Sequence, residues 1–324
     1  MIGGIAAVVL FDVTVGILWI WKPWLPPVEI VDPGPTGRRI DEAGVFANYY
    51  PAQGEPKGAI LLLGGSLGGI PEYVDRPARA LQEHGYTVLA PSYFRAPGQP
   101  RNLERIPLET FDRALAWLTS QPDVPARRLA VMGTSKGAEV APLVALRHPE
   151  VRAVVVASPS SAVWPGVRWE TINAFNADSS WTSDGEPLAY VPYASFHPAV
   201  LIGDVGRFYR DAVARVTDHP EAAIPIEDLQ APVLLICGEI DRLWPSCPMS
   251  HQLAERAEAA EGPPVTILAY ERVGHALLEP PYPHPDVGPK PRWGGSAADE
   301  NEAKADSWPR VLGFLDDHVA GAVP

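Results

Sequence analysis

Short apolar segments alternate with helical segments along most of this chain, and no other feature of the sequence constrains its fold as strongly. Residues 58–63 (GAILLL) form an apolar run that ends in glycines, which is typical of a buried strand, and residues 72–84 then show helical spacing. Strands that alternate with helices favour a mostly parallel, doubly wound sheet with helices on both faces. The sequence therefore predicts the α/β class. Further strands are expected at 86–91, 128–133, 151–158, 233–238 and 265–270, and further helices at 107–120, 136–147 and 302–319.

Residues 159–230 interrupt this alternation. The segment is rich in Trp, Pro and Ser and has a helical pattern only near 204–216. We interpret it as an insertion folded over the carboxyl edge of the sheet, that is, a cap. The predicted main domain therefore covers residues 58–324 with the cap inside it, and a Pro-rich spacer with an edge strand precedes it at 25–57.

The first residues differ from the rest of the chain. Residues 2–21 contain a single charged side chain, Asp12, and a helix of that length rises about 30 Å, enough to cross a bilayer core. Three tryptophans and a lysine gather at its C-terminal end, as at a membrane interface. We expect residues 1–24 to form a single-pass membrane anchor and leave open on which side the remaining chain lies. A buried helix in a cytoplasmic protein is the alternative.

Charge and cysteine content narrow the function classes. Acidic residues outnumber basic ones by 39 to 26, which gives a net charge of −13. Such a surface repels phosphate backbones, so we expect no nucleic-acid partner. Cys237 and Cys247 are too few for a disulfide framework or a four-ligand zinc site, and we expect no metal and no cofactor.

The pattern G-x-S-x-G occurs twice, around Ser66 and around Ser135. A nucleophile elbow needs a strand before the serine and a helix directly after it, and small flanking residues let the two pack closely. Ser135 meets this requirement, because RLAVMG precedes it and KGAEVAPLVALRH follows it. Ser66 does not, because the following LGGIP cannot start a regular helix at the next residue. Ser135 is therefore the candidate nucleophile.

A serine nucleophile needs a general base, and the base needs an orienting carboxylate. Asp241 follows the expected strand at 233–238, and His275 follows the one at 265–270, so both lie at carboxyl ends of strands. The order Ser, Asp, His is that of α/β-hydrolases, and the gap of 106 residues between Ser135 and Asp241 can hold the cap. We predict a triad of these three residues. The alternatives are Glu239 as the orienting acid, and His197, His251 or His284 as the base.

The glycines around Ser66 suit a different task. Glycines after an early strand leave backbone N–H groups free to face a developing oxyanion. We therefore expect an oxyanion hole formed by the N–H of Lys136, the residue after the nucleophile, and an N–H from the loop of Gly65, Ser66 and Leu67. A plain turn between strand and helix is the alternative for this loop.

Several stretches of the chain resemble one enzyme family. They include LLLGGSLGGIPEY, IPLETFDRALAWL, VMGTSKGAEVAPLVA, ICGEIDRLWPS and GHALLEPPYPHP, and they extend over about residues 58–319. These stretches are similar to the C-terminal catalytic domain of the acyl-CoA thioesterase and bile-acid-CoA:amino-acid N-acyltransferase family, which has the α/β-hydrolase fold. The resemblance implies the same roles: Ser135 as nucleophile, Asp241 as orienting acid and His275 as base.

Two features depart from the family pattern. Animal members carry an N-terminal immunoglobulin-like domain, for which the 57 residues before position 58 are too few, so the chain resembles the stand-alone bacterial form. The amino-acid transferases of the family use a cysteine nucleophile, whereas this chain has Ser135, as the thioesterases do. Because an oxygen ester is less prone to aminolysis than a thioester, hydrolysis is favoured over transfer to an amine.

The resemblance implies hydrolysis of an acyl-CoA thioester to free acid and CoA through an acyl-enzyme. The alternatives are a carboxylesterase or dienelactone-type hydrolase, an acyl-CoA:amino-acid N-acyltransferase, and a non-catalytic, membrane-tethered binding module. The expected partners are thus a small acyl thioester or ester and, through residues 2–21, a membrane. Candidates for substrate contacts are Arg95, Arg242 and Arg272 for CoA phosphates, and Trp164, Trp169, Trp181 and Trp244 for an acyl pocket beneath the cap.

Overall fold

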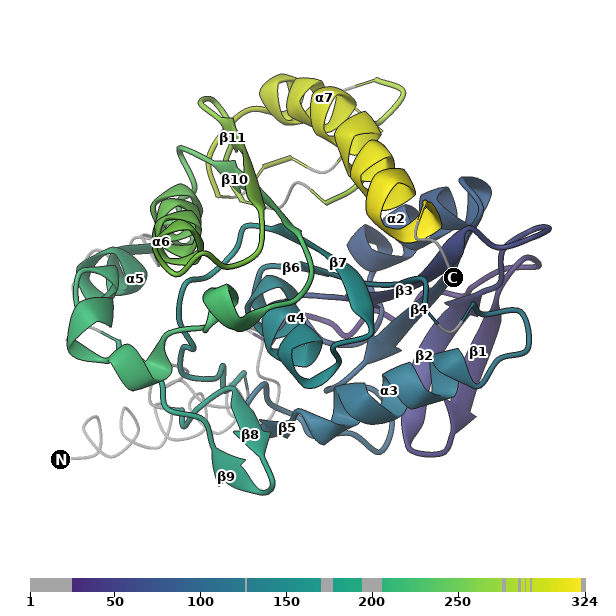
Figure 1. The fold of residues 1–324 in the computed structure, drawn as a ribbon, viewed down its shortest axis with the longest axis horizontal. Helices are drawn as coiled ribbons and strands as arrows, with labels where there is room; N and C mark the ends of the chain where they lie inside the picture. The colour runs from purple at the N-terminus through teal and green to yellow at the C-terminus, as the bar shows by residue number, and fades with distance from the viewer. Residues whose placement is uncertain are drawn as a thin grey trace, which may run out of the picture.

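An eight-stranded sheet forms the centre of the computed structural model (Figure 1). The structure describes residues 25–125, 127–169, 177–193, 206–275, 278–284, 287–288, 290–291 and 293–321. In spatial order, the strands are β1 (Arg38–Glu42), β2 (Val45–Tyr50), β4 (Tyr86–Ser92), β3 (Gly58–Leu63), β6 (Leu129–Thr134), β7 (Val151–Ala157), β10 (Val233–Gly238) and β11 (Val265–Tyr270).

Six of these strands run parallel to one another, from β4 to β11. The hairpin of β1 and β2 adds antiparallel strands at the β4 edge. The predicted mostly parallel α/β sheet is therefore confirmed. The carboxyl ends of the parallel strands meet at one edge, which is where loops can carry a site.

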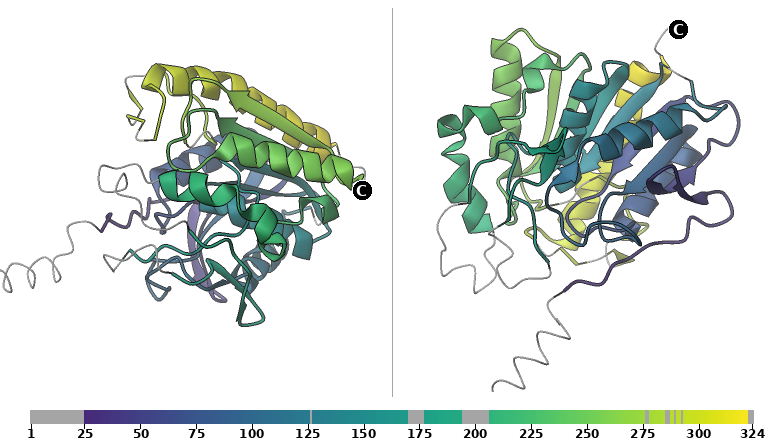
Figure 2. Two further views of the ribbon diagram at one scale, coloured as in Figure 1. Left: turned by 90° about the vertical axis from the view of Figure 1, so that its left-hand side faces the viewer. Right: turned by 90° about the horizontal axis from the view of Figure 1, so that it is seen from below.

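Helices cover both faces of the sheet (Figures 1 and 2). The alternation of strand side chains explains this, because Leu61 belongs to one core with Phe111, whereas its neighbour Ile60 belongs to a second core with Trp308. The first core lies under α3 (Glu109–Thr119), α4 (Lys136–Arg147) and α6 (Ser246–Ala259), and the second lies under α2 (Glu72–Glu83) and α7 (Ala297–Leu315), which continues into a π-helical segment (Asp316–Ala320).

The insertion between β7 and β10 contains little regular structure. It has the helix α5 (Gly206–Val213) and the short strands β8 (Trp181–Ser183) and β9 (Glu186–Pro187). Strand β8 pairs with β5 (Ile106–Pro107) on one side and with β9 on the other. Three short 3-10 turns follow at Val216–Asp218, Pro220–Ala222 and Ile226–Asp228. A small apolar core of its own holds it together, in which Trp164 and Tyr209 pack with Trp244 from the loop after β10.

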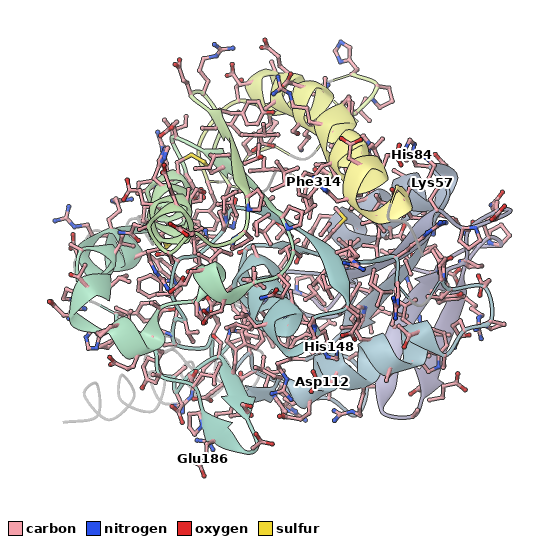
Figure 3. All side chains as sticks on the ribbon, viewed as in Figure 1. Lys57, His84, Asp112, His148, Glu186 and Phe314 are labelled. Carbon is pink, nitrogen blue, oxygen red and sulfur yellow. A yellow bond between two sulfur atoms is a disulfide. The ribbon has the colours of Figure 1, made fainter. Side chains whose placement is uncertain are left out.

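Ion pairs at the periphery join segments that are distant in sequence (Figure 3). Asp316, at the end of α7, lies 2.9 Å from Lys57 Nζ and 3.0 Å from His84 Nε2. On α3, Asp112 lies 2.9 Å from His148 Nε2. These two histidines thus have carboxylate partners at the ends of α2 and α4, away from the candidate base.

The predicted membrane anchor at residues 1–24 lies outside the described residues. Within the described ranges, no helix combines the length and the apolar composition that crossing a bilayer requires. Even α7, with 19 residues, carries six charged side chains. No described helix supports the predicted single-pass anchorage or a membrane partner, and we withdraw both predictions.

Candidate active site

Ser135 occupies the sharp turn between β6 and α4. Its backbone lies at φ 56° and ψ −120°, a conformation that is rare for a residue with a Cβ atom. A Cβ on Gly133 would collide with the backbone of Gly137, and a Cβ on Gly137 would collide with the carbonyl of Leu63. Close packing thus requires both glycines of the pattern. The other copy, around Ser66, lies in a loop that does not lead directly into a helix.

His275 and Asp241 lie against each other beyond the carboxyl ends of β11 and β10. Nδ1 of His275 is 2.8 Å from Oδ2 of Asp241, and both side chains are buried. Because an ionised carboxylate only accepts hydrogen bonds, Nδ1 is the donor, which leaves Nε2 of a neutral imidazole as an acceptor.

The Asp241 carboxylate is fixed by its own loop. Its Oδ1 accepts the backbone N–H groups of Leu243 at 2.9 Å and Trp244 at 3.2 Å. Its Oδ2 also accepts the hydroxyl of Ser246 at 2.8 Å. Together with Nδ1 of His275, four donors therefore bind this carboxylate. A carboxylate fixed in this way also fixes the orientation of the His275 ring.

A series of contacts joins Ser135 to the histidine. The N–H of Ser135 donates to the carbonyl of Ala157, and the next carbonyl, that of Ser158, accepts the indole N–H of Trp244 at 3.1 Å. The Trp244 ring meets the His275 ring edge-on, with centroids 5.7 Å apart. Within the described residues, the buried Nε2 of His275 has no hydrogen-bond partner, Ser135 included. Catalytic hydrogen bonds of this kind often form only with substrate bound.

The glycine-rich loop between β3 and α2 touches the elbow. A Cβ on Gly65 would lie 3.2 Å from the Cβ of Ser135. The N–H of Gly65 donates to the hydroxyl of Tyr73 at 3.0 Å, so this member of the predicted oxyanion set is engaged within the protein. The other predicted donors, the N–H groups of Ser66, Leu67 and Lys136, make no hydrogen bond to a described residue.

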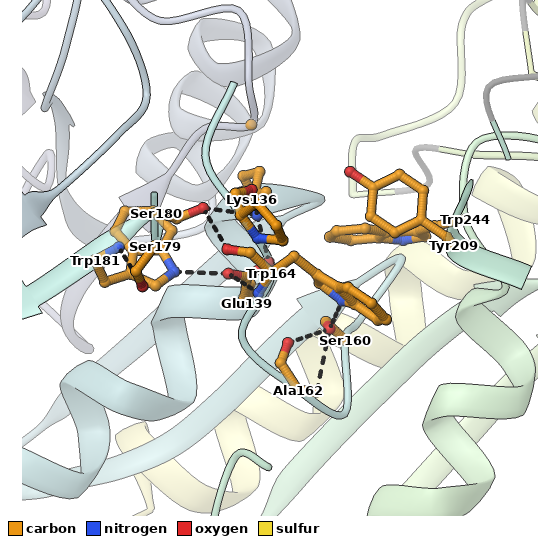
Figure 4. Close-up of polar contacts among 12 residues, drawn as sticks. Lys136, Glu139, Ser160, Ala162, Trp164, Ser179, Ser180, Trp181, Tyr209 and Trp244 are labelled. Carbon is orange, nitrogen blue, oxygen red and sulfur yellow. Dashed lines mark hydrogen bonds and ion pairs between the residues drawn. The ribbon is translucent and has the colours of Figure 1, made fainter. Parts of the chain in front are cut away.

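Lys136, the residue after the nucleophile, and Glu139 form a buried ion pair through their side chains (Figure 4). Nζ of Lys136 lies 2.8 Å from the Glu139 carboxylate and also donates to the Ser180 hydroxyl at 2.8 Å and the Pro165 carbonyl at 3.2 Å. Burial lowers the pKa of Lys136 and raises the pKa of Glu139, and their mutual attraction opposes both shifts.

Glu139 also binds two tryptophan segments of the insertion (Figure 4). Its Oε1 accepts the indole N–H of Trp181 at 2.8 Å and the backbone N–H of Trp164 at 3.2 Å. The first turn of α4 is thereby fastened to the insertion. This role was not among the predictions from the sequence, although the spacing of Lys136 and Glu139 by one helical turn was a usable signal.

The tryptophans proposed to line an acyl pocket have mostly structural contacts. Trp164 and Trp181 have no exposed surface, and Trp244 is 2% exposed. Their indole N–H groups bind protein acceptors, that of Trp164 the hydroxyl of Ser160 at 2.7 Å. Trp169 is only partly buried and donates to the carbonyl of Ser66 at 2.8 Å, so it lies against the glycine-rich loop.

The arginines proposed for CoA phosphates also contact protein groups. Arg95 donates to the carbonyl of Leu67 at 2.8 Å and to the carbonyl of Pro26. Arg272 pairs with Asp299 of α7 at 2.6 Å. Arg95 thus borders the glycine-rich loop, whereas Arg272 belongs to a surface pair.

The alternative acid and bases do not share the buried position of Asp241 and His275. Glu239, His251 and His284 are exposed, and His197 lies outside the described residues. In the described part of the chain, no group of three His, Cys, Asp or Glu side chains is arranged to hold a metal ion.

A disulfide between Cys237 and Cys247 closes the loop that carries Asp241. Cys237 lies near the end of β10 and Cys247 in the first turn of α6, ten residues later. The cysteine count excluded a disulfide framework and did not anticipate this single bridge. The available signal was the position of the two cysteines on either side of a candidate catalytic loop.

Comparison with known proteins identifies relatives of the chain. The family model described as "BAAT / Acyl-CoA thioester hydrolase C terminal" matches residues 106–321. Acyl-coenzyme A thioesterase 6 of Mus musculus is 28% identical over 309 residues, which cover 90% of this chain and 67% of the relative. Bile acid-CoA:amino acid N-acyltransferase of Mus musculus is 26% identical over 300 residues, which cover 89% of this chain and 67% of the relative. For acyl-coenzyme A thioesterase 2, mitochondrial, of Homo sapiens, 26% identity extends over 84% of this chain and 55% of the relative. The chain thus spans between about half and two thirds of the length of these relatives.

Solved structures support the α/β-hydrolase fold. A protein from Klebsiella pneumoniae described as a dienelactone hydrolase superposes with a TM-score of 0.55 at 18% identity, covering 87% of this chain and 98% of that chain. An acylaminoacyl peptidase from Pyrococcus horikoshii superposes with a TM-score of 0.54 at 12% identity, covering 94% of this chain and 44% of that one.

Proposed function

Because this chain belongs to the BAAT / acyl-CoA thioester hydrolase C-terminal family, we propose that it hydrolyses acyl-CoA thioesters through Ser135, His275 and Asp241. A fold alone hosts many activities, so the site must carry the argument. The observation that best supports the proposal is the position of three residues. Ser135 on its strained turn and the buried pair of His275 and Asp241 lie on adjoining loops at the carboxyl edge of one sheet. That arrangement supports the proposed roles of Ser135 as nucleophile, His275 as base and Asp241 as orienting acid.

In the first half-reaction, Ser135 Oγ attacks the thioester carbonyl carbon while Nε2 of His275 takes the hydroxyl proton. The carbonyl electron pair moves onto oxygen, where the N–H of Lys136 and an N–H of the glycine-rich loop stabilise it. As the carbonyl re-forms, the carbon–sulfur bond breaks and His275 protonates the leaving thiolate. The products are free CoA and an acyl ester on Ser135.

In the second half-reaction, water takes the place of Ser135 as the nucleophile. His275 removes a proton from water, the hydroxide equivalent attacks the acyl ester, and Ser135 leaves with the proton from His275. Asp241 keeps Nδ1 protonated and stabilises the imidazolium in both halves. Water is the preferred acceptor because the intermediate is an oxygen ester.

The proposal is tested by measuring free thiol released from a series of acyl-CoA substrates, acetyl to palmitoyl, beside p-nitrophenyl esters of the same acids. Wild type and Ser135→Ala are compared, with circular dichroism to show that both are folded. We expect thiol release by wild type and its loss in the variant. Addition of an amino acid should leave free acid as the main product.

Three other outcomes would change the assignment. Turnover of esters without turnover of acyl-CoA would retain the triad and reject CoA as leaving group. Conjugate formed with the added amino acid would indicate acyl transfer. Inactivity toward all substrates in a folded sample would contradict hydrolysis and favour a binding role.

A further inference from the structure

Tyr73, in the first turn of α2, contacts the loop that we propose to bind the oxyanion. Its hydroxyl oxygen accepts the N–H of Gly65 at 3.0 Å. An N–H that donates to a tyrosine is not available to a substrate, so the loop has one donor fewer than its glycine content suggests. Under the proposed function, another group must take the place of this donor.

The Tyr73 hydroxyl and the nucleophile lie beside the same backbone unit. A Cβ built on Gly65 would be 3.2 Å from the Cβ of Ser135 and 3.4 Å from Oη of Tyr73. The two side chains therefore approach Gly65 together. An acyl carbonyl bound to Ser135 would be within reach of the Tyr73 hydroxyl.

The hydroxyl of Tyr73 has its own proton available. A phenol both donates and accepts, and here the oxygen already accepts from Gly65. Within the described ranges, no acceptor forms a hydrogen bond with the Tyr73 O–H. An N–H that donates to the oxygen also polarises the O–H bond and makes it a better donor.

We propose that Tyr73 is a catalytic residue that donates a hydrogen bond from Oη to the oxyanion formed when Ser135 attacks. The Gly65 N–H then acts through Tyr73. Burial raises the pKa of Tyr73 to about 12, so the hydroxyl remains a donor over the working pH range. Oxyanion stabilisation requires a preorganised donor, and the hydrogen bond from Gly65 provides that orientation.

Tyr93, which follows β4 and contacts the same loop, offers a matched control. Its hydroxyl donates to the carbonyl of Gly64 at 2.6 Å, and the residue is buried. Tyr93→Phe removes the hydrogen bonds of that hydroxyl to the carbonyls of Gly64 and Gly65, which support the loop, but it leaves the Tyr73 hydroxyl in place. Tyr73→Phe removes both loop support and the proposed donor.

The test measures two rates in wild type, Tyr73→Phe, Tyr93→Phe and Ser135→Ala of the full chain. The first is kcat and KM for thiol release. The second is the rate of Ser135 phosphonylation by a fluorophosphonate, which also places negative charge on an oxygen and needs no acyl-CoA. We expect Tyr73→Phe to lower kcat and the phosphonylation rate by at least about tenfold with little change in KM, and by more than Tyr93→Phe does.

Equal rates in Tyr73→Phe and wild type would overturn the role of Tyr73 and leave the proposed function intact. Equal losses in the two phenylalanine variants would assign both tyrosines to loop support and overturn it as well. A wild-type protein that takes no phosphonate label would reject the proposed function together with the role of Tyr73. Thermal melts of each variant distinguish a lost donor from a lost fold.

Discussion

The Asp241 carboxylate lies 2.8 Å from Nδ1 of His275, across 34 residues of sequence, and both side chains are buried. This contact decides which histidine nitrogen carries the proton. Because Asp241 also accepts two backbone N–H groups and a serine hydroxyl, its position does not depend on His275.

Asp241→Asn should therefore lower kcat far more than it lowers stability. An amide can donate to Nδ1, which selects the wrong tautomer, and a loss of about 10⁴-fold is known for triads. Steady-state kinetics would measure the loss. Glu239→Gln, on the same loop but exposed, should stay within about twofold of wild type. Comparable losses in the two variants would contradict the assignment of Asp241.

The Lys136–Glu139 pair should be coupled in stability. Glu139→Gln leaves Lys136 buried without its counter-charge and should cost about 3–5 kcal/mol. The double variant Lys136→Met, Glu139→Gln should lose less than the sum of the two single variants, because no uncompensated charge remains. Urea unfolding of the four proteins gives the coupling. Additive losses would mean that the two charges do not interact.

Reduction of the Cys237–Cys247 disulfide should loosen the Asp241 loop. A bridge over a loop of this size contributes about 2–4 kcal/mol. The double Cys→Ser variant should lose that amount in urea unfolding and should also lose kcat, because Asp241 then holds His275 less firmly. Wild type kept under reductant should match the variant. Identical stability with and without reductant would contradict this account.

Glu300 should make stability depend on pH. Burial raises its pKa to about 7, while Lys304, at 3.5 Å, opposes the shift. The unfolded chain then releases the Glu300 proton at lower pH than the folded chain does, so stability is full below about pH 4.5 and falls as pH rises towards 7. Glu300→Gln should reduce this fall by about 2 kcal/mol. Melting curves between pH 4.5 and 8 that have the same slope in both proteins would exclude Glu300 as the cause.

The periodicity of apolar residues was sufficient to predict the strands that lead to Ser135, Asp241 and His275. The apolar segments before Ser135, Asp241 and His275 are short, and the first two end in glycine, so strand ends could be located to within a residue or two. In α7, the Ser296 side chain accepts the N–H of Asp299 and starts the helix before the predicted residue 302. The helix α6 was missed because alanine and charged residues interrupt its apolar pattern.

Contacts between distant segments could not be predicted in this way. The engagement of the Gly65 N–H by Tyr73 depends on how α2 packs on the sheet, and a glycine-rich sequence alone indicates only that N–H groups are accessible. The binding of Trp181 by Glu139 spans 42 residues and requires the folded insertion. Such pairs form because buried polar groups need partners, and periodicity does not identify which partner is near.

The most direct test of the central claim is to trap the acyl-enzyme. The protein is mixed with a saturating acyl-CoA, quenched in acid during turnover and digested, and the peptides are weighed. We predict that the peptide containing Ser135 gains the mass of the acyl group, and that Ser135→Ala gains none and releases no thiol. Thiol release that persists in Ser135→Ala, or an acyl group found on another residue during turnover, would contradict the account.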